Sequence, residues 1–149
     1  MFNRIFPQEK LNKYRGNPVA KWVLAILTIV TLARSLVHMF SPDGGAQSIA
    51  TIPLDKFTPS WTETVILMFA LWGLSQLLIG IVYVAVLWRY KALISLMYLL
   101  MLIEYGMRIV LGSLKPIETV GTAPGAIGNY VIVPLAAVML ALSLRGSKG

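Results

Sequence analysis

Four long apolar stretches, separated by shorter polar ones, dominate the sequence. A helix rises about 1.5 Å per residue, so about 20 apolar residues are enough to cross the hydrocarbon core of a bilayer. The pattern predicts four membrane-spanning helices at residues 19–40, 61–88, 92–112 and 126–144. The expected fold class is therefore all-α, an integral membrane four-helix bundle in which residues 1–149 form a single transmembrane domain.

Two polar connections, residues 41–60 and 113–125, join the first predicted helix to the second and the third to the fourth. The first carries the turn signal Pro42-Asp43-Gly44-Gly45. It also exceeds about 12 to 15 residues, a length typical of functional or disordered loops. Only Arg89-Tyr90-Lys91 separates the second helix from the third, so we expect these two helices to be antiparallel neighbours.

Composition and charge placement agree with a membrane protein. Hydrophobic residues make up 57% of the chain and charged residues 13%, whereas a soluble domain carries about 25% charged residues. On one side of the predicted membrane lie only two basic residues, Lys56 and Lys115, while Arg34 and Arg108 fall within the spans. The other side holds nine basic residues: Arg4, Lys10, Lys13, Arg15, Lys21, Arg89, Lys91, Arg145 and Lys148.

This asymmetry predicts both termini in the cytoplasm and a multi-pass protein of the cell (inner) membrane, because cytoplasmic loops carry the excess of Lys and Arg. The formal net charge of +7 would indicate nucleic-acid binding in a soluble protein. Here the placement of the basic residues on one side of the predicted membrane accounts for that charge, and these residues form no stripe on a folded face. We therefore expect no nucleic-acid partner.

Two pairs of ionisable residues lie inside the predicted spans. Arg34 and His38 are four residues apart, as are Glu104 and Arg108, so each pair shares one helix face. An ionisable group at the centre of a span costs about 2.5 to 3.5 kcal/mol, so such groups usually mark a paired internal site. From the helix rise, Arg34 lies about 22 Å and Glu104 about 18 Å from the cytoplasmic starts of their spans. We expect the two pairs to meet.

The second predicted helix contributes Gln76 at the same level. It belongs to a stripe of Gly73, Gln76, Gly80 and Tyr83 at helical spacing, and glycines permit close approach of two helices. Tyr105 is available to complete the hydrogen bonding. The prediction is an outward-facing polar pocket beneath the two outer loops, with ligand-binding residues Arg34, His38, Gln76, Glu104 and Arg108.

Glu104 neutralises Arg34, Arg108 or both, but one carboxylate does not balance two guanidiniums, which stay charged. The surplus positive charge indicates an anionic or amphiphilic ligand such as a phosphate, a carboxylate or a lipid headgroup, or a solvated vestibule. The planar fork of arginine binds carboxylate and phosphate with two hydrogen bonds. Two other interpretations stay open: a structural lock that fixes helix order, and a contact with a membrane protein partner or a second copy of the chain.

The sequence carries no signature of a cofactor or a metal site. There is no cysteine and only one histidine, so thiolate, zinc and haem sites are not expected. The glycines of residues 121–128 lack the Lys-Ser/Thr ending of a phosphate loop. No nucleophile elbow supports a catalytic triad. The enzymatic alternative is acid–base chemistry on a lipid-soluble substrate, with Glu104 or His38 as the base.

Four short spans, an arginine toward the outer end of the first helix and a charged third helix resemble the DoxX-like group of small bacterial membrane proteins. The resemblance covers most of the chain in hydropathy and rests on no specific motif; the segment HMFSPDGG, residues 38–45, is not assigned to that group's pattern. It implies a four-helix membrane protein and no particular site residues. The predicted function is binding of an anionic or amphiphilic, lipid-like molecule, with an accessory or assembly subunit as a further alternative.

Overall fold

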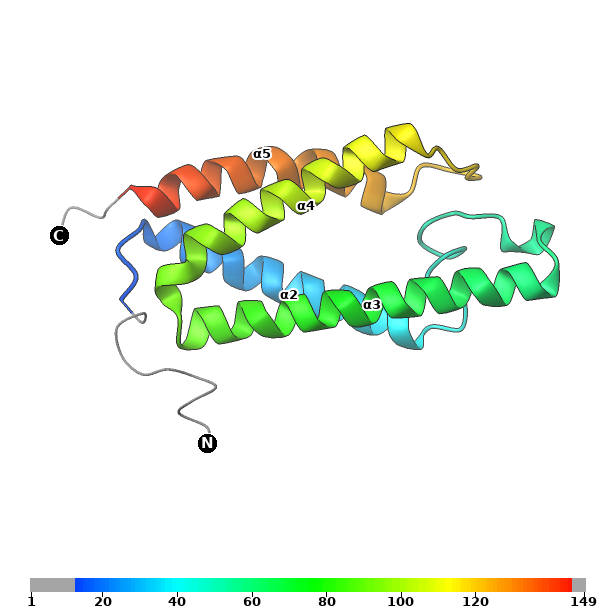
Figure 1. Ribbon diagram of the computed structural model, residues 1–149, viewed down its shortest axis with the longest axis horizontal. Coiled ribbons are helices and arrows are strands. Elements are labelled where there is room, and N and C mark those ends of the chain that lie inside the picture. Colours follow the sequence, from blue (N-terminus) through cyan, green and yellow to red (C-terminus); the bar gives the residue numbers. More distant parts are fainter. Residues whose placement is uncertain (1–12, 146–149) are drawn as a thin grey trace.

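The computed structural model describes residues 13–145, which contain helices and no strand (Figure 1). The four long helices are α2 (Pro18–Phe40), α3 (Pro59–Trp88), α4 (Ile94–Leu114) and α5 (Pro124–Leu144). Two single-turn 3-10 helices, η1 (Leu54–Lys56) and η2 (Lys91–Leu93), lie in the connections. The prediction of an all-α fold with four long helices is confirmed for the described residues.

Proline sets where three of the four helices begin. Pro18, Pro59 and Pro124 each stand at a helix start, where the missing N–H has no intrahelical partner to lose and the fixed φ suits the helix. These helices therefore begin one or two residues earlier than predicted. In front of Pro18, the side chain of Asn17 accepts a hydrogen bond from the N–H of Val19 at 2.9 Å and caps α2.

The third span is shifted along the chain relative to the predicted residues 92–112. Residues 91–93 form the tighter η2, so the α-helix starts only at Ile94. At its other end α4 continues to Leu114 and stops before Lys115-Pro116. A residue that precedes proline is pushed out of the helical region, which explains why the helix ends there.

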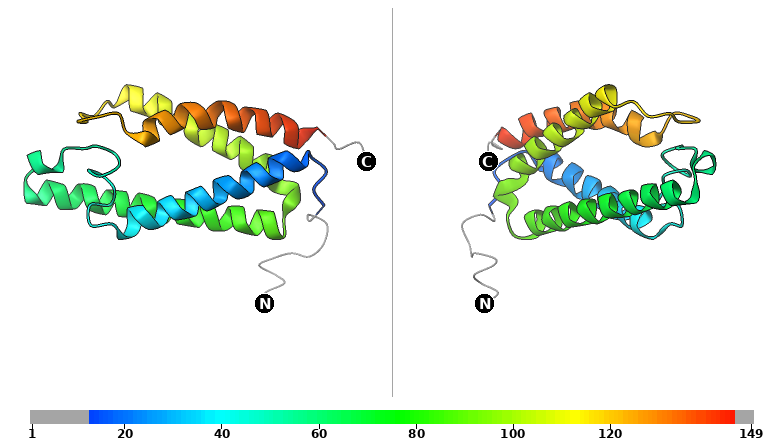
Figure 2. Two further views of the ribbon diagram at one scale, coloured as in Figure 1. Left: turned by 180° about the vertical axis from the view of Figure 1, so that it is seen from behind. Right: turned by 45° about the vertical axis from the view of Figure 1, so that its right-hand side comes forward.

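The four helices form two pairs. α2 lies mainly against α3, and α4 mainly against α5, whereas α3 and α4 touch only little. Figures 1 and 2 show the helices converging at the end that carries residues 13–17 and 145, called here the terminal end, and the pairs diverging toward the loop end, which carries residues 41–58 and 115–123. The expectation that α3 and α4 are neighbours is right only near the terminal end, because their short connection fixes only the ends it joins.

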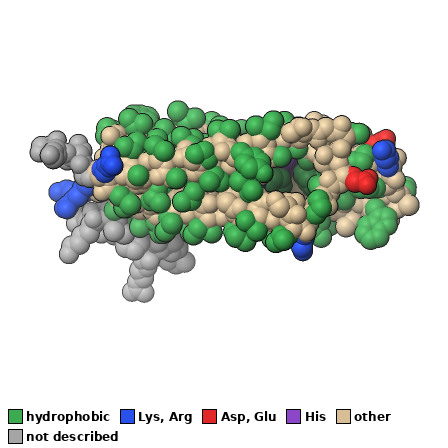
Figure 3. All heavy atoms as spheres, turned by 90° about the horizontal axis from the view of Figure 1, so that it is seen from above, with side chains coloured by type: hydrophobic (Ala, Val, Ile, Leu, Met, Phe, Trp, Pro, Cys, Tyr) green, Lys and Arg blue, Asp and Glu red, His purple; other side chains and the backbone are tan. Residues whose placement is uncertain are grey.

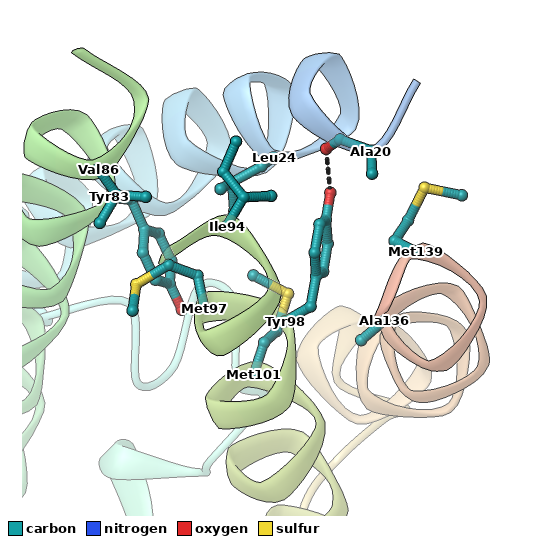
Figure 4. Packing of buried hydrophobic residues seen from close by; sticks show 10 residues of the cluster. All are labelled: Ala20, Leu24, Tyr83, Val86, Ile94, Met97, Tyr98, Met101, Ala136 and Met139. Carbon is teal, nitrogen blue, oxygen red and sulfur yellow. Dashed lines mark hydrogen bonds between the residues drawn. The ribbon is translucent and has the colours of Figure 1, made fainter. Parts of the chain in front are cut away.

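The packed core lies in the terminal half of the bundle (Figure 4). Tyr98 is fully buried there, and its hydroxyl donates to the carbonyl of Ala20 at 2.5 Å. A buried tyrosine usually needs such a partner, so this ring is both packed and satisfied. The core cluster consists of ten buried residues from all four helices: Ala20, Leu24, Tyr83, Val86, Ile94, Met97, Tyr98, Met101, Ala136 and Met139.

The first long connection folds back onto α3. Its residues Ala46, Ile52 and Leu54 are buried and pack against partly buried side chains of α3. Thr51 joins it to the second connection. The Thr51 hydroxyl donates to the Gly121 carbonyl at 2.8 Å, and the Thr51 backbone carbonyl accepts the N–H of Val120 at 2.9 Å. These two hydrogen bonds link the helix pairs at the loop end.

Asp43 organises the turn that follows α2. Its carboxylate accepts the N–H groups of Gly45, Gln47 and Ser48 at 2.9, 3.1 and 2.7 Å. Burial acts to raise the pKa of the Asp43 carboxyl, but hydrogen bonds from Ser48 and Gly45 outweigh it and hold that pKa well below its ordinary value. Gly44 and Gly45 have φ of 60° and 75°, a region in which glycine is unstrained.

All four long helices are long and apolar enough to cross a membrane. Most of their exposed side chains are large hydrophobic residues, which cover much of the surface in Figure 3. These features are typical of a multi-pass membrane protein. The cytoplasmic placement of the termini stays a prediction; Arg4, Lys10 and Lys148, which enter that charge count, lie outside the described residues.

Candidate functional site

A glycine stripe brings α3 close to α2. A Cβ atom added to Gly73 would lie 2.8 Å from the Cβ of His38 and 3.0 Å from the carbonyl oxygen of Ser35. A Cβ atom on Gly80 would lie 2.6 Å from the Cδ2 of Leu32. The predicted stripe is confirmed, and the absence of these side chains allows the two helices to touch. The buried residues of α3 are Gly73, Gln76, Gly80, Tyr83 and Val86.

A chain of hydrogen bonds runs from α2 through α3 to α4. The Nη2 of Arg34 donates to the Oε1 of Gln76 and, at 3.2 Å, to the hydroxyl of Tyr105. The amide nitrogen of Gln76 donates to Glu104 Oε1 at 3.3 Å, and Arg108 forms an ion pair with that same oxygen. Four of the five predicted site residues therefore lie in one continuous network that crosses three helices.

The single carboxylate of this network pairs with Arg108 and reaches Arg34 only through Gln76. Within residues 13–145, Arg34 forms no ion pair, and its Nε is buried without a hydrogen-bond partner. The amide of Gln76 satisfies part of the hydrogen bonding of Arg34 but carries no charge, so it neutralises nothing. The network therefore contains one guanidinium more than it has carboxylates.

Trp72 forms an aromatic wall beside both arginines. Its ring centre lies 5.7 Å from the guanidinium carbon of Arg34 and 5.0 Å from that of Arg108. The ring of Tyr105 lies 4.9 Å from the same carbon of Arg108. A cation within about 6 Å of a ring centre is attracted to the electron-rich face, by about 2 kcal/mol when water is excluded. The aromatic side chains therefore stabilise two neighbouring positive charges without neutralising either of them.

His38 lies beside this network rather than in it. Its ring is buried 4.7 Å from the ring of Trp72, and its Nδ1 lies 2.7 Å from the carbonyl oxygen of Gly44. A carbonyl only accepts, so the proton is assigned to Nδ1, which leaves Nε2 as the basic nitrogen. No residue in the described part of the chain hydrogen-bonds Nε2. Residues 13–145 contain no cluster of three or more His, Cys, Asp and Glu side chains able to hold a metal.

A cavity of about 480 Å³ lies in the loop half of the bundle, where Figure 3 shows the surface hollowed. Arg34, His38 and Arg108 line it, but Gln76 and Glu104 do not. Glu104 instead borders a groove of about 400 Å³ between α3 and α4. The cavity thus differs from the predicted polar pocket: three of the five residues reach it, no carboxylate does, and most of its lining is apolar.

Three further lining residues, Phe69, Trp72 and Asn129, were not predicted as site residues. Phe69 and Trp72 precede Gln76 at helical spacing on the stripe that faces α2, so the sequence did contain a signal for them. Asn129 lies on α5 among glycines and alanines, and small residues in a membrane helix usually indicate only close packing. Nothing in the sequence pattern of α5 indicated a cavity wall.

Comparisons of this chain with protein-family models, with curated proteins and with solved structures find no match. The resemblance to the DoxX-like group therefore stays an expectation that rests on hydropathy. Any functional conclusion has to come from the geometry of the network and the cavity.

Proposed function

We propose that this protein binds an amphiphilic anion in the cavity, with a carboxylate or phosphate group held by Arg34 and Arg108. The observation that carries the proposal is that both guanidiniums line the cavity, whereas Glu104, the carboxylate of the network, borders the groove on the other side. Arginine suits such anions because its planar fork makes two parallel hydrogen bonds. The apolar remainder of the lining suits the hydrocarbon part of the ligand.

The proposal includes a cellular setting, an inner membrane with both termini in the cytoplasm and the loop end on the outer side. The described basic residues support it through the excess of Lys and Arg that cytoplasmic segments carry. Those at the terminal end are Lys13, Arg15, Lys21, Arg89, Lys91 and Arg145. In this orientation the cavity takes its ligand from the outer half of the bilayer or from the external solution.

Native mass spectrometry with added hexadecanoate tests the binding. Arg34→Gln and Arg108→Gln remove one positive charge each from the cavity wall, and we expect each to weaken hexadecanoate binding by about tenfold or more, since a hydrogen bond to a charged group contributes about 1.5 to 3 kcal/mol. Lys56→Gln is the matched control, because Lys56 is exposed at the loop end and does not line the cavity. Equal binding by all three variants and the wild type would contradict the proposal.

The structural-lock interpretation gives a different result in the same experiment. If the arginines serve only to fix helix order, Arg34→Gln lowers the unfolding temperature but leaves hexadecanoate binding to the folded fraction unchanged. A ligand site instead lowers binding even where the variant remains folded. Measuring unfolding and binding on the same samples therefore separates the two.

A second candidate function, acid–base catalysis on a lipid-soluble substrate, is favoured by His38. Its imidazole lines the cavity with the proton fixed on Nδ1 by Gly44, which leaves Nε2 as a base. Glu104, the other base considered from the sequence, is paired with Arg108 and does not line the cavity. Incubating the wild type and His38→Gln with a membrane lipid extract tests this candidate; identical product profiles would exclude it.

A further inference from the structure

The cavity changes character along the axis of the bundle. Leu27 and Met101 line its inner part, Arg34 and Arg108 lie farther along toward the loop end, and apolar residues such as Ile49 and Ala50 of the first connection close it there. In α2 and in α4 alike, the arginine follows the apolar residue by seven positions, which corresponds to about 10 Å along a helix. Two helices that run in the same direction therefore pass from an apolar to a cationic lining over the same distance.

The first turns of α5 line the cavity with mostly small residues. Gly125 and Gly128 line the cavity, and a Cβ atom added to either would meet no other atom within 4 Å. The space in front of both glycines is therefore open, and because both line the cavity we expect a larger side chain at either position to occupy part of it. Gly106 of α4 also has no atom within 4 Å of an added Cβ but does not line the cavity, so it is a matched control position.

The cavity opens on the side of the bundle. In the left view of Figure 2, α2 and α5 lie side by side near the terminal end and move apart toward the loop end. Val30 lines the cavity and is nevertheless 54% exposed, so the lining continues into the outer surface of α2. The opposite wall is formed by α5. In a membrane, the gap between α2 and α5 faces lipid chains.

Resting on the proposed function, we infer that the ligand is a single-chain anionic amphiphile of the fatty-acid class, drawn sideways from the leaflet around the loop end. Its carboxylate lies at Arg34 and Arg108, and its chain runs past Leu27 and Met101 toward the middle of the membrane. A lipid of that leaflet has the same orientation, with its head at the surface and its chain toward the middle. It therefore enters between α2 and α5 without turning over.

Fluorescence of Trp72 in phosphatidylcholine vesicles tests the orientation. Trp22, Trp61 and Trp88 are 64%, 67% and 70% exposed, so replacing each by Phe leaves the interior intact and Trp72 as the only reporter. The probes are 2-bromohexadecanoate, which carries the quenching bromine beside the carboxylate, and 16-bromohexadecanoate, which carries it at the chain end. We expect saturable quenching that is several-fold stronger with the 2-bromo probe. Equal or reversed quenching would overturn the inferred orientation.

The same assay tests entry from the side. Gly128→Leu and Gly125→Leu are each added to the variant that keeps Trp72 as its only tryptophan. Each places a bulky side chain at the cavity, and we expect the apparent affinity for 2-bromohexadecanoate to fall about tenfold. Gly106→Leu should leave the affinity unchanged. Excess inorganic phosphate in the buffer should not displace the probe. An equal effect of all three leucine variants, or displacement by phosphate, would overturn the inference.

Arg34→Gln in the same background separates the two proposals. Weaker quenching in Arg34→Gln, together with unchanged quenching in both cavity-filling glycine variants, would leave the anion site standing and overturn the membrane-derived ligand. Unchanged quenching in Arg34→Gln would overturn both. Thermal unfolding of each variant confirms that folded proteins are being compared. If one of the two cavity-filling glycine variants fails to fold, the other still gives the result.

Discussion

In the terminal half of the bundle, ten buried side chains from all four helices fill the space between them, whereas in the loop half the same helices enclose a cavity of about 480 Å³. In the terminal half, the buried hydroxyl of Tyr98 is uncharged and donates a hydrogen bond to the carbonyl of Ala20. In the loop half, Arg34 lacks a carboxylate partner among the described residues. The interior of the terminal half is packed and uncharged, and the interior of the loop half is open and positively charged.

The difference shows what holds each half together. Between helices in lipid there is no hydrophobic driving force, so association depends on close packing and hydrogen bonds. The terminal half has the packing. The loop half relies on the contact of α2 with α3 at Gly73, on the network through Gln76, and on the two hydrogen bonds of Thr51. Substitutions in the two halves should therefore have different consequences.

Truncation of the core should give the largest effect. Leu24 is fully buried in the terminal half, and Leu24→Ala should lower the free energy of unfolding by about 2 kcal/mol, the lower end of the range for buried leucine, because lipid already solvates apolar groups. Val30→Ala, at the half-exposed mouth of the cavity, should change it by less than about 0.5 kcal/mol. Reversible unfolding in mixed detergent micelles measures both. Equal losses would remove the distinction between the halves.

Disruption of the helix contact at Gly73 should give the next largest loss in the free energy of unfolding. In Gly73→Ala the new methyl group meets the Cβ of His38 and the backbone of Ser35, neither of which moves without α2, so we expect a loss of about 1 to 2 kcal/mol. Gly80→Ala meets only the end of the Leu32 side chain, which can rotate away, and should lose less. Gly106→Ala should be neutral or slightly stabilising. The same unfolding assay ranks the three, and a neutral Gly73→Ala would contradict the close contact.

Much of the fold followed from the sequence because the spans are regular and apolar. The prolines could also have indicated where three helices begin. The predicted spans nevertheless placed Pro18, Pro59 and Pro124 outside the helices. Apolar periodicity does not show that proline is favoured in the first turn. The divergence of α3 and α4 was not predictable from their short connection. It depends on how each helix packs on its other neighbour.

The candidate site was predictable in part, for a physical reason. Charged residues in a membrane have to meet polar partners, which brought together Arg34, Gln76, Glu104 and Arg108. Which groups line the cavity depends instead on side-chain direction and on the space between helices. Spacing did not show that Glu104 borders a different groove from the arginines. Nor did it show that glycines of α5 form a wall, since the same residues pack tightly in other membrane helices.

Loss of the bridging amide should weaken the link between the helix pairs. Gln76→Leu leaves the Nη2 of Arg34 with only the Tyr105 hydroxyl and removes the tie from α2 to Glu104, so we expect a loss of about 1 kcal/mol. Ser75→Leu is the control, because Ser75 is exposed on the neighbouring face and bonds only its own helix. Amide hydrogen exchange should rise in the loop half of the Gln76 variant alone. Increased exchange in the terminal half would show that the halves are not separable.

The smallest effect should come from the turn at Asp43, and it depends on pH. The folded state holds the pKa of the Asp43 carboxyl below its ordinary value, so the stabilisation is complete above that ordinary value of about 4 and is lost as the pH falls through the folded pKa. Acid should therefore loosen residues 41–50. Asp43→Asn should partly reproduce that loosening at neutral pH, since its amide nitrogen cannot accept a backbone N–H and its remaining oxygen, which carries no full charge, accepts more weakly.

The measurement is hydrogen exchange at the N–H groups of Gly45, Gln47 and Ser48, which the carboxylate accepts. We expect faster exchange at all three in Asp43→Asn and a global loss below about 1 kcal/mol, because the turn lies outside the packed core. Asp55→Asn is the control, since Asp55 is exposed in the same connection and accepts only a long side-chain hydrogen bond from Gln47. If the Asp43 variant also speeds exchange around Tyr98, the terminal core is coupled to the loop end and does not stand alone.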